Sequence, residues 1–528
     1  MMKLAVLDLE TDPFAPDTMV WPFVGGFYTE DRFISWWSPN CVKQMVDFLQ
    51  NEEEQYVIYA HNGGRFDYFY FLPYLKENMR IVNGRIIQAM LGKHELRDSF
   101  AIMPFALKQF EKTEIDYNTF RADLRETHRG TIVSYLRDDC VNLWKLCSSF
   151  RSEFGDSLTI GSASLKQLKK FHTFSSGSKQ YDSKFREKFY FGGRCQVFKS
   201  GIIDGPVNVY DVNSMYPYVM ANYLHPMGIG NELSNKIEKN TMFVVVQGVN
   251  RGAFPQRMDD GSLDFTTPIG VYHTTIHEYR AALETKTFAP SRILKTYGFH
   301  PLGCFDEFVS HFYNARRTAS EQGDKIKTIF YKFVLNSAYG KFAQNPQNYF
   351  DWSICPVGEL PAKWHECVKS CVVDCRLKWS PVWVNQGYII WQRPTIKEYY
   401  YNIAIGASIT GAARAHLLRG LAHAKTAYYC DTDSIICHSL SSVPLGNSAL
   451  GDWKLETSGD HFACAGKKLY AIWRDGKLVK KAHKGANLSG DQILDVCRGN
   501  IVEYRNPVPN FRFDGTYRFT KRNIRKTA

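Results

Sequence analysis

Residues 428 to 436 read Tyr-Tyr-Cys-Asp-Thr-Asp-Ser-Ile-Ile, and this stretch constrains the fold more than any other. Aromatic and β-branched residues on both sides of a short polar segment predict two strands joined by a tight turn. The turn carries two carboxylates, Asp431 and Asp433. Such an acidic tip on an apolar hairpin is unfavourable unless a cation compensates it, and a divalent metal ion commonly does so. A solvated surface hairpin is the competing interpretation of a lone Asp-x-Asp.

The composition bounds the class of protein. At 528 residues the chain exceeds one ordinary hydrophobic core, so several subdomains are expected. Lys and Arg total 65 against 53 acids, a formal charge of +12, which favours a polyanionic partner such as nucleic acid over a merely soluble basic surface. Thirteen scattered cysteines, early carboxylates and no long apolar run predict reduced thiols, no signal peptide and no membrane span, hence an intracellular protein.

Four acidic residues accompany three predicted core elements in the N-terminal third. Asp8 and Glu10 follow a short apolar run and point to one face if that run is a strand. Asp67 comes just after a glycine-rich turn that closes a second apolar run. Asp139 lies one helical turn after Tyr135 in a segment with helical periodicity. Taken singly, each acid could be a solvated surface charge.

Together these carboxylates suit phosphodiester hydrolysis with two metal ions about 4 Å apart, and Tyr135 could orient the attacking water. The ordered set Asp-x-Glu, Asn-x-x-x-Phe-Asp and Tyr-x-x-x-Asp resembles the three exonuclease motifs of DnaQ-like proofreading nucleases. That resemblance implies an RNase H-like 3′–5′ exonuclease domain over residues 1–150. It also assigns an unpaired primer end to Thr11, Asn62, Phe66, Ser99 and Phe100. Stacking on bases suits the two phenylalanines, and a core role for either is equally open.

The next segment, residues 151–189, is rich in Ser, Lys and Gly and predicts a linker. The residues after this segment include Tyr190, Gly192, Gly193 and Arg194. The glycines allow close backbone approach, and the Tyr and Arg could follow a phosphate backbone, although an ordinary turn is the alternative. The string resembles the Tyr-x-Gly-Gly signature that joins the exonuclease and polymerase domains of family B DNA polymerases and contacts the template.

Two further strings strengthen the same resemblance. The strand-like run before Asp211 continues as Asp-Val-Asn-Ser-Met-Tyr-Pro, similar to the first polymerase motif of family B enzymes, and the acidic hairpin is similar to the third. The resemblance implies that Asp211 and Asp433 share two Mg²⁺ ions with the triphosphate of the incoming nucleotide, Mn²⁺ being a substitute, and that Asp431 supports them. Tyr216 would lie under the sugar and exclude a 2′-hydroxyl.

A cationic segment complements these acids. Residues 305–342 lack proline and predict one long helix, on which Lys325, Lys332 and Tyr339 recur every seven residues along one face. The string around Lys332 matches the second polymerase motif, and helical lysines suit a triphosphate. Two lysines alone would be read as a solvated stripe. The expected nucleotide-binding residues here are Lys325, Lys332, Asn336, Tyr339 and Gly340.

The C-terminal part carries weaker signals. Lys468 and Tyr470 resemble a Lys-x-Tyr motif that steadies the primer terminus, and the basic tail from 512 to 526 could contact duplex phosphates or be solvated. Three cysteines recur every four residues, which is not a usual zinc spacing and favours packing. They are Cys367, Cys371 and Cys375.

The motifs run in order through nearly the whole chain, and its compact size resembles the protein-primed subgroup of phages, adenovirus-like elements and linear plasmids. That implies a multidomain α/β and α+β fold with a right-hand polymerase: palm and fingers over 190–466, with insertions near 230–300 and 341–400, and thumb and basic tail over 467–528. The implied function is DNA-directed DNA synthesis with proofreading, strand displacement and a protein-primed start. The implied partners are primer-template DNA, dNTPs and a terminal protein, for a monomer in the host cytoplasm.

Other functions fit less well. A non-catalytic DNA-binding derivative would have lost part of the carboxylate set, which is complete here. A stand-alone nuclease would leave the string from Lys332 to Gly340 without a purpose. A reverse transcriptase or RNA polymerase would lack the upstream nuclease motifs. A conventional DNA-primed family B polymerase is usually much longer.

Overall fold

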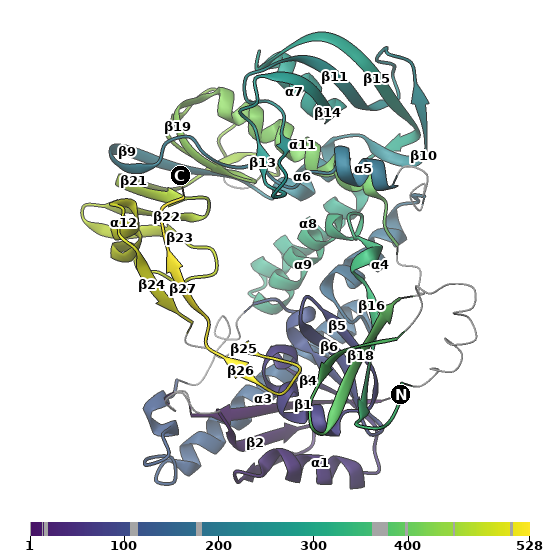
Figure 1. Ribbon diagram of the computed structural model, residues 1–528, viewed down its shortest axis with the longest axis vertical. Coiled ribbons are helices and arrows are strands. Elements are labelled where there is room, and N and C mark those ends of the chain that lie inside the picture. The colour runs from purple at the N-terminus through teal and green to yellow at the C-terminus, as the bar shows by residue number, and fades with distance from the viewer. Residues whose placement is uncertain are drawn as a thin grey trace. The chain divides into compact units, whose positions relative to one another are not determined.

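The computed structural model describes residues 2–12, 14, 20–105, 114–175, 182–361, 379–395, 400–446, 449–506 and 510–527. Its contacts divide the chain into two compact units (Figure 1). Unit 1 comprises Met1–Ala163, Asn345–Tyr399 and Val508–Phe519. Unit 2 comprises Ser164–Gln344, Tyr400–Pro507 and Thr520–Ala528.

Among the described residues, unit 1 contains a ten-stranded mixed sheet. Its strands, in spatial order, are β17 (Ser380–Val384), β18 (Tyr388–Pro394), β16 (Phe350–Pro356), β5 (Glu77–Val82), β6 (Arg85–Leu91), β7 (His94–Asp98), β4 (Tyr56–Ala60), β1 (Lys3–Thr11), β2 (Pro22–Tyr28) and β3 (Phe33–Trp37). β4 pairs parallel with both β1 and β7, and the other neighbours are antiparallel. All of β4 is buried, as expected for a covered parallel strand.

Helices pack on this sheet, and the helix predicted from the periodicity around Tyr135 and Asp139 is one of them. They are α1 (Cys41–Asn51), α2 (Asp67–Phe71) and α3 (Arg129–Phe154). α3 packs against β1, β2 and β4, and α1 packs against β2 and β3. The predicted apolar stripe of α3, including Leu136 and Leu143, is buried. An α/β layer in unit 1 is therefore confirmed.

Residues 341–400 were expected as an insertion of the palm, and most of them belong to unit 1 instead. β16 pairs with β5, which places Trp352 opposite Met79. The ring of Trp352 stacks on Trp383 with centroids 5.5 Å apart, and Trp383 contacts Phe513 from the C-terminal region. Aromatic burial explains this location, because pairing with β5 covers both the edge and the face of the sheet. The three regularly spaced cysteines, Cys367, Cys371 and Cys375, lie outside the described residues.

The described part of unit 2 contains a seven-stranded antiparallel sheet. Its strands, in spatial order, are β23 (Lys477–Ala482), β22 (Leu469–Arg474), β21 (Trp453–Gly466), β9 (Gly201–Val212), β20 (Ser434–Leu440), β19 (Ala424–Asp431) and β8 (Cys195–Val197). Its central strands β9 and β20 carry the run before Asp211 and the second arm of the acidic hairpin. The predicted strand-turn-strand is thus confirmed.

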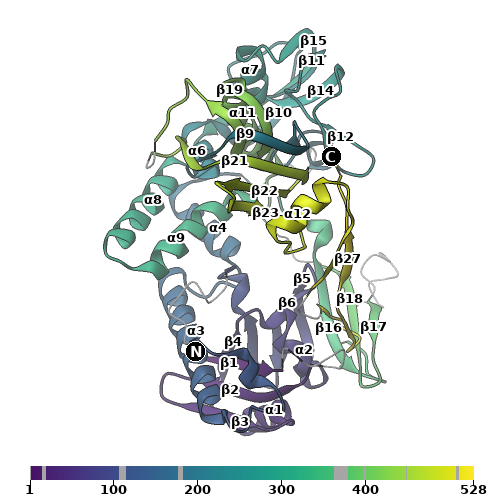
Figure 2. The same ribbon diagram turned by 90° about the vertical axis from the view of Figure 1, so that its left-hand side faces the viewer.

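A second sheet of unit 2 has four strands among the described residues, β10 (His225–Leu233), β15 (Phe288–Gly303), β11 (Thr241–Asn250) and β14 (Ile269–Thr275). A hairpin of β12 (Gln256–Arg257) and β13 (Leu263–Asp264) and helix α7 (Ile276–Glu284) lie in the same segment. Helix α11 (Ile403–Ala422) contacts β19 and β20 as well as α7, β10 and β14, so it runs between the two sheets (Figure 2). The alanine-rich sequence of α11 suits this buried place.

The prediction of one long helix from 305 to 342 is wrong, because the helix is interrupted. It is two packed helices, α8 (Asp306–Glu321) and α9 (Lys325–Ser337). Gly323 has φ +73°, a left-handed conformation that glycine adopts without strain and that ends α8. The Asp324 side chain then caps α9 by accepting a hydrogen bond from Lys327 N at 2.9 Å.

The segment expected as a linker is partly helical. α3 runs past residue 150, and α4 (Ile160–Phe171) and α5 (Asp182–Lys188) follow. In the C-terminal region, α12 (Gly490–Cys497) packs on β21 and β22. Four short strands complete the described chain: β24 (Val502–Arg505), β25 (Asn510–Phe511), β26 (Tyr517–Arg518) and β27 (Lys521–Ile524). Every helix within the described ranges is too short or too polar to span a bilayer.

Candidate active sites

Three acids of unit 1 converge where β1 meets α3. Asp8 and Glu10 come from β1, and Asp139 comes from α3, which packs on that strand. One carboxylate oxygen of each lies within 4.8 Å of the others. Three like charges this close repel one another unless a cation lies among them, so the donor set suits a hard divalent metal ion.

Asp67 adjoins this cluster. It begins α2, is 2% exposed, and its Oδ1 has no hydrogen-bond partner among the described residues. Burial, and then the charge of Asp8, raises its pKa well above the usual value. A buried carboxylate oxygen without a partner, beside three other acids, fits a site that a cation completes.

The turn before Asp67 has the predicted tight geometry. Asn62 adopts a left-handed conformation with φ 62°, and Gly63 to Arg65 form one 3₁₀ turn. A Cβ at Gly64 would collide with the carbonyl oxygen of Ile86. Glycine is therefore required for the close approach that sets the start of α2.

Tyr135 lies on the same side of α3 as Asp139. It is buried, and its hydroxyl lies 3.3 Å from that of Tyr117. Burial, the Tyr117 contact and the charges of Asp139 and Glu10 all raise its pKa, so the phenol stays protonated. Tyr117 was missed in the sequence, because a tyrosine in a short polar turn carries no motif.

The residues assigned to an unpaired primer end differ in their surroundings. Ser99 is buried and contacts Ala60 O at 3.3 Å and His61 Nδ1 at 3.0 Å. One face of Phe100 lies under the Arg85 guanidinium at 4.5 Å. His61 and Arg85 were not predicted.

Phe66 and Thr11 complete that set. The ring of Phe66 packs edge-to-face on Tyr70 and Phe511, so a hydrophobic packing role for Phe66 is present. Thr11 ends β1 and is partly exposed.

The two acids of unit 2 meet across β9 and β20. Ser434 is the register partner of Asp211, and Val212 N donates to Asp433 O at 2.8 Å. Burial, then the charge of Asp433, raises the pKa of Asp211 to about 7, and burial likewise raises the pKa of Asp433. Two half-buried acids whose charged forms are disfavoured by burial are suited to bind a metal ion.

Asp431 is compensated by protein groups. Lys468 Nζ lies 2.5 Å from its Oδ2, and the Tyr429 hydroxyl donates to the same oxygen at 3.3 Å. Lys468 N donates to the Tyr429 hydroxyl at 3.1 Å, and Tyr470 packs on Tyr429 with centroids 5.1 Å apart. The Lys-x-Tyr pair is thereby joined to the acidic hairpin.

A further carboxylate, Glu456, was missed. It follows the β21 residues paired with the end of β9 and forms an ion pair with Lys480. Its charge helps raise the pKa of both Asp211 and Asp433. A single glutamate on a strand gives no sequence signal, so only the strand pairing reveals it.

The residues expected to bind the nucleotide lie on α6, on α9 and on the 3₁₀ turn that follows α9. Tyr216, on α6 (Met215–Asn222), stacks on Tyr339 with centroids 3.9 Å apart and planes 8° apart. Lys332 is exposed on α9, and its charge lowers the pKa of Asp211. Lys325, Asn336 and Gly340 are also exposed.

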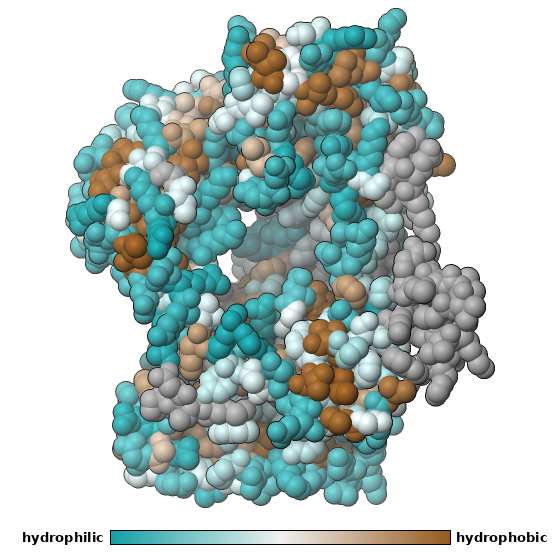
Figure 3. Space-filling model, viewed as in Figure 1, coloured by the Kyte–Doolittle hydropathy of each residue, from teal (hydrophilic) through white to brown (hydrophobic). Residues whose placement is uncertain are grey.

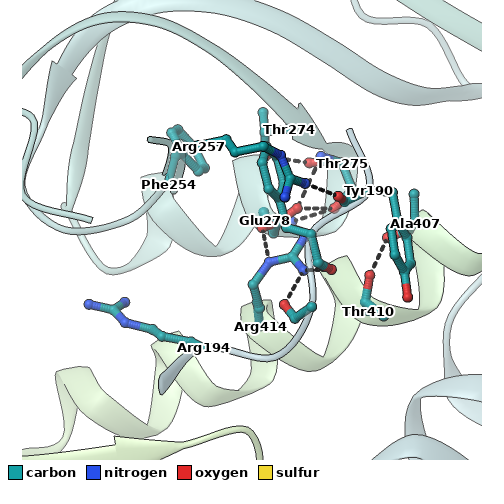
Figure 4. A network of polar contacts seen from close by, with 12 residues as sticks. Tyr190, Arg194, Phe254, Arg257, Thr274, Thr275, Glu278, Ala407, Thr410 and Arg414 are labelled. Atoms are coloured by element: carbon teal, nitrogen blue, oxygen red, sulfur yellow. Dashed lines mark hydrogen bonds and ion pairs between the residues drawn. The ribbon is translucent and has the colours of Figure 1, made fainter. Parts of the chain in front are cut away.

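The loop from Tyr190 to Arg194 is held by a buried ion pair that the sequence did not predict (Figure 4). Arg414 on α11 donates from Nε to Glu278 at 2.7 Å and from Nη1 to the carbonyls of Phe191 and Gly192 at 2.5 and 2.8 Å. Both charged side chains are buried, so each needs the other. Arg414 thus fixes the backbone of the glycine-rich loop.

The same loop touches the acidic hairpin. Thr432 N donates to Arg194 O at 2.7 Å, and a Cβ at Gly193 would collide with the Thr432 side chain. The Arg194 side chain is 4% exposed, donates to Gly252 O at 2.8 Å and lies over Phe265 at 4.3 Å. This burial argues against the phosphate contact expected of Arg194.

Comparisons with known proteins identify the family of the chain. Residues 106–427 match the family described as DNA polymerase type B, organellar and viral. A DNA-directed DNA polymerase of Enterobacteria phage PRD1 is 42% identical over 99% of this chain and 98% of its own length. A DNA polymerase of Bacillus phage B103 is 23% identical over 97% of this chain and 95% of its own.

Solved structures of phi29 DNA polymerase share the fold. The complex with single-stranded DNA has a TM-score of 0.73 at 18% identity, and the ternary complex with primer-template DNA and incoming nucleotide has 0.72 at 18%, each over the full length of both chains. The expected exonuclease and right-hand polymerase architecture is thereby confirmed. This chain belongs to the type B DNA polymerases of the organellar and viral kind and is a DNA-directed DNA polymerase.

Proposed function

We propose that this polymerase lengthens a DNA strand in unit 2 and trims its 3′ end in unit 1. The observation that carries the proposal is the presence of a separate acid cluster within each unit, Asp8, Glu10 and Asp139 in one and Asp211 and Asp433 in the other. The named acids of each cluster come from a single unit, so each cluster has the means to support its own reaction.

Two Mg²⁺ ions in each cluster, with Mn²⁺ as a substitute, are the expected cofactors. The partnerless oxygen of Asp67 and the raised pKa of Asp211 support this choice, because a bound cation would compensate the charge that burial disfavours at each acid. When bound, the ions activate the attacking oxygen and stabilise the leaving one. The residues that would hold them are Asp8, Glu10, Asp67, Asp139, Asp211 and Asp433.

The surrounding side chains have distinct roles in extension. Lys325 and Lys332 on α9 bind the triphosphate, and Asn336 and Gly340 border it. Lys468 keeps Asp431 neutralised and steadies the primer end, since its Nζ ion pair fixes the turn. The loop fixed by Arg414 supports the template strand beside Thr432.

The stacked pair of Tyr216 and Tyr339 supports selection of the sugar. A ring held flat by another ring cannot swing away from a 2′-hydroxyl, so Tyr216→Ala should raise ribonucleotide incorporation at least about tenfold relative to dNTP. Single-nucleotide insertion with matched dNTP and rNTP measures this ratio. Tyr218→Ala on the same helix is the control, and an unchanged ratio in Tyr216→Ala would refute the gate.

In trimming, Tyr135 donates from its protonated hydroxyl to orient the attacking water beside Asp139 and Glu10. Ser99 and Phe100 border the strand end, with Arg85 holding the Phe100 ring in place.

We further propose that synthesis begins on the hydroxyl of a terminal protein. The motif resemblance to the protein-primed subgroup and the compact chain support this. In unit 2, the four-stranded sheet within the first predicted insertion exposes apolar side chains, among them Ile229, Ile269 and Val271, and hydrophobic residues gather over this sheet in Figure 3. An apolar surface of this kind suits a protein partner.

The test incubates the enzyme with labelled dNTP, Mg²⁺ and candidate proteins encoded by the same genome. Covalent labelling of one protein, lost in the Asp433→Asn enzyme, is the expected result. If primed DNA is extended efficiently and no protein is labelled, the enzyme is a conventional DNA-primed polymerase.

A further inference from the structure

A pair of histidines is buried behind the helix that carries Tyr216. His225 is 0% exposed, and its Nε2 lies 2.9 Å from Val219 O in α6. Its Nδ1 lies 2.9 Å from the Ser408 hydroxyl on α11. His225 therefore links α6 to the central helix of unit 2.

A second buried histidine also contacts a backbone carbonyl, in this case one that follows α6. His277 on α7 is 7% exposed, and its Nε2 lies 3.0 Å from Leu224 O, just beyond the end of α6. The same nitrogen lies 3.4 Å from the Ser408 hydroxyl, and the two imidazoles are 6.0 Å apart. Ser408 thus contacts both imidazole rings, and each ring contacts a backbone carbonyl in or just after the last turn of α6.

The chemistry allows one arrangement of protons. Burial lowers the pKa of His225 to about 4 and that of His277 to about 3, so both rings are neutral at ordinary pH. A carbonyl only accepts, so Nε2 of each ring carries the hydrogen and donates. Nδ1 of His225 is then an acceptor, and the Ser408 hydroxyl donates to it. Every polar atom of His225 is satisfied, which makes the cluster rigid.

The same ring contacts the base of α8. His225 stacks on Phe305, the residue before α8, with centroids 5.9 Å and planes 25° apart, and Phe305 N donates to Met220 O at 2.8 Å. The end of α6 is thus fixed from β10, α7, α11 and the start of α8. Tyr216 lies one helical turn before Val219, so a shift of this end of α6 would also displace Tyr216.

We propose that His225, through Val219 and Ser408, is a positioning residue that holds Tyr216 in register for the incoming nucleotide. The inference rests on the proposed role of Tyr216. It adds a second layer behind the nucleotide site, supplied by neutral imidazoles that touch neither substrate nor metal.

Three variants test it in the full-length enzyme. His225→Leu removes both hydrogen bonds, His225→Gln keeps a donor near Val219 O, and Ser408→Ala removes only the donor to Nδ1. Because loss of these buried hydrogen bonds lets the end of α6 shift, we expect the KM for dNTP to rise about tenfold in His225→Leu and a few-fold in Ser408→Ala. We expect kcat and primer-template affinity to change less than about twofold, and His225→Gln to restore most of the KM.

His94 supplies a matched control in unit 1. It is 1% exposed, accepts at Nδ1 from Tyr56 N at 3.2 Å and donates from Nε2 to Leu49 O in α1 at 2.7 Å. His94→Leu should lower the melting temperature as His225→Leu does and leave the KM for dNTP unchanged. A KM rise in both would mean that lost stability explains the effect and would overturn the inference.

Sugar selection separates this inference from the proposed function. If Tyr216→Ala relaxes selection and folded His225→Leu changes neither selection nor KM, the positioning role is wrong and the gate stands. If Tyr216→Ala itself leaves selection unchanged, the gate fails and the inference fails with it. Should His225→Leu not fold, Ser408→Ala and His225→Gln carry the same comparison, and an unchanged KM in Ser408→Ala overturns the role of the serine bridge.

Discussion

Asp433→Asn should abolish nucleotide addition while 3′ trimming of single-stranded DNA continues at its normal rate. The substitution keeps the shape of the side chain and removes one of the two charges that meet across β9 and β20. Charge stabilisation by a metal pair contributes several kcal/mol, and each 1.4 kcal/mol is about tenfold in rate, so kcat should fall at least about 10³-fold. Primer extension and degradation of a labelled oligonucleotide, measured on one preparation, give both rates.

The matched control is Asp204→Asn. Asp204 lies on the same strand as Asp211, but its side chain is 82% exposed and pairs with His461. Its loss should leave extension within about twofold of the unmodified enzyme, as expected for surface ion pairs. If Asp433→Asn stopped extension and trimming together in a folded protein, one shared site would have to serve both reactions.

The converse substitution, Asp8→Ala with Glu10→Ala, should remove trimming and spare extension. These two acids supply most of the cluster in unit 1, and without them Asp139 and Asp67 hold too little charge for a divalent ion. The expected fall in trimming is at least about 10³-fold, for the reason given above. Mismatched primer ends should also persist longer before extension.

Asp47→Ala serves as the control within unit 1. Asp47 lies on α1, and its half-exposed carboxylate pairs with Lys43. If the double variant trimmed DNA in a metal-dependent way as fast as Asp47→Ala does, the nuclease reaction would take place elsewhere in the chain.

The sequence predicted the reacting groups better than their supports. The hairpin at Asp431 and Asp433 was predictable because strand propensity and an acidic turn are local properties. The apolar stripe of α3 was predictable because its period is local as well. The ordered motifs likewise predicted that Asp8, Glu10 and Asp139 share one site, and the three side chains lie together in the structure.

The remaining features depend on contacts between distant segments. Glu456 becomes visible only when β21 pairs with β9, and Arg414 only when α11 meets the glycine-rich loop. The break at Gly323 was missed because one glycine is tolerated within many helices. The burial of Arg194 was missed because an arginine beside glycines reads as a surface contact, whereas Phe265 covers it.

The chain passes back and forth between its units, and β16, which begins at Phe350, extends a sheet whose first strand begins at Lys3. A gene fragment that ends at residue 163 would leave the edge of β5 bare and the aromatic ring of Phe69 without its partner Phe513. An exposed strand edge beside an uncovered aromatic surface invites aggregation. A fragment cut from the N-terminal end of the gene therefore cannot supply a complete unit 1.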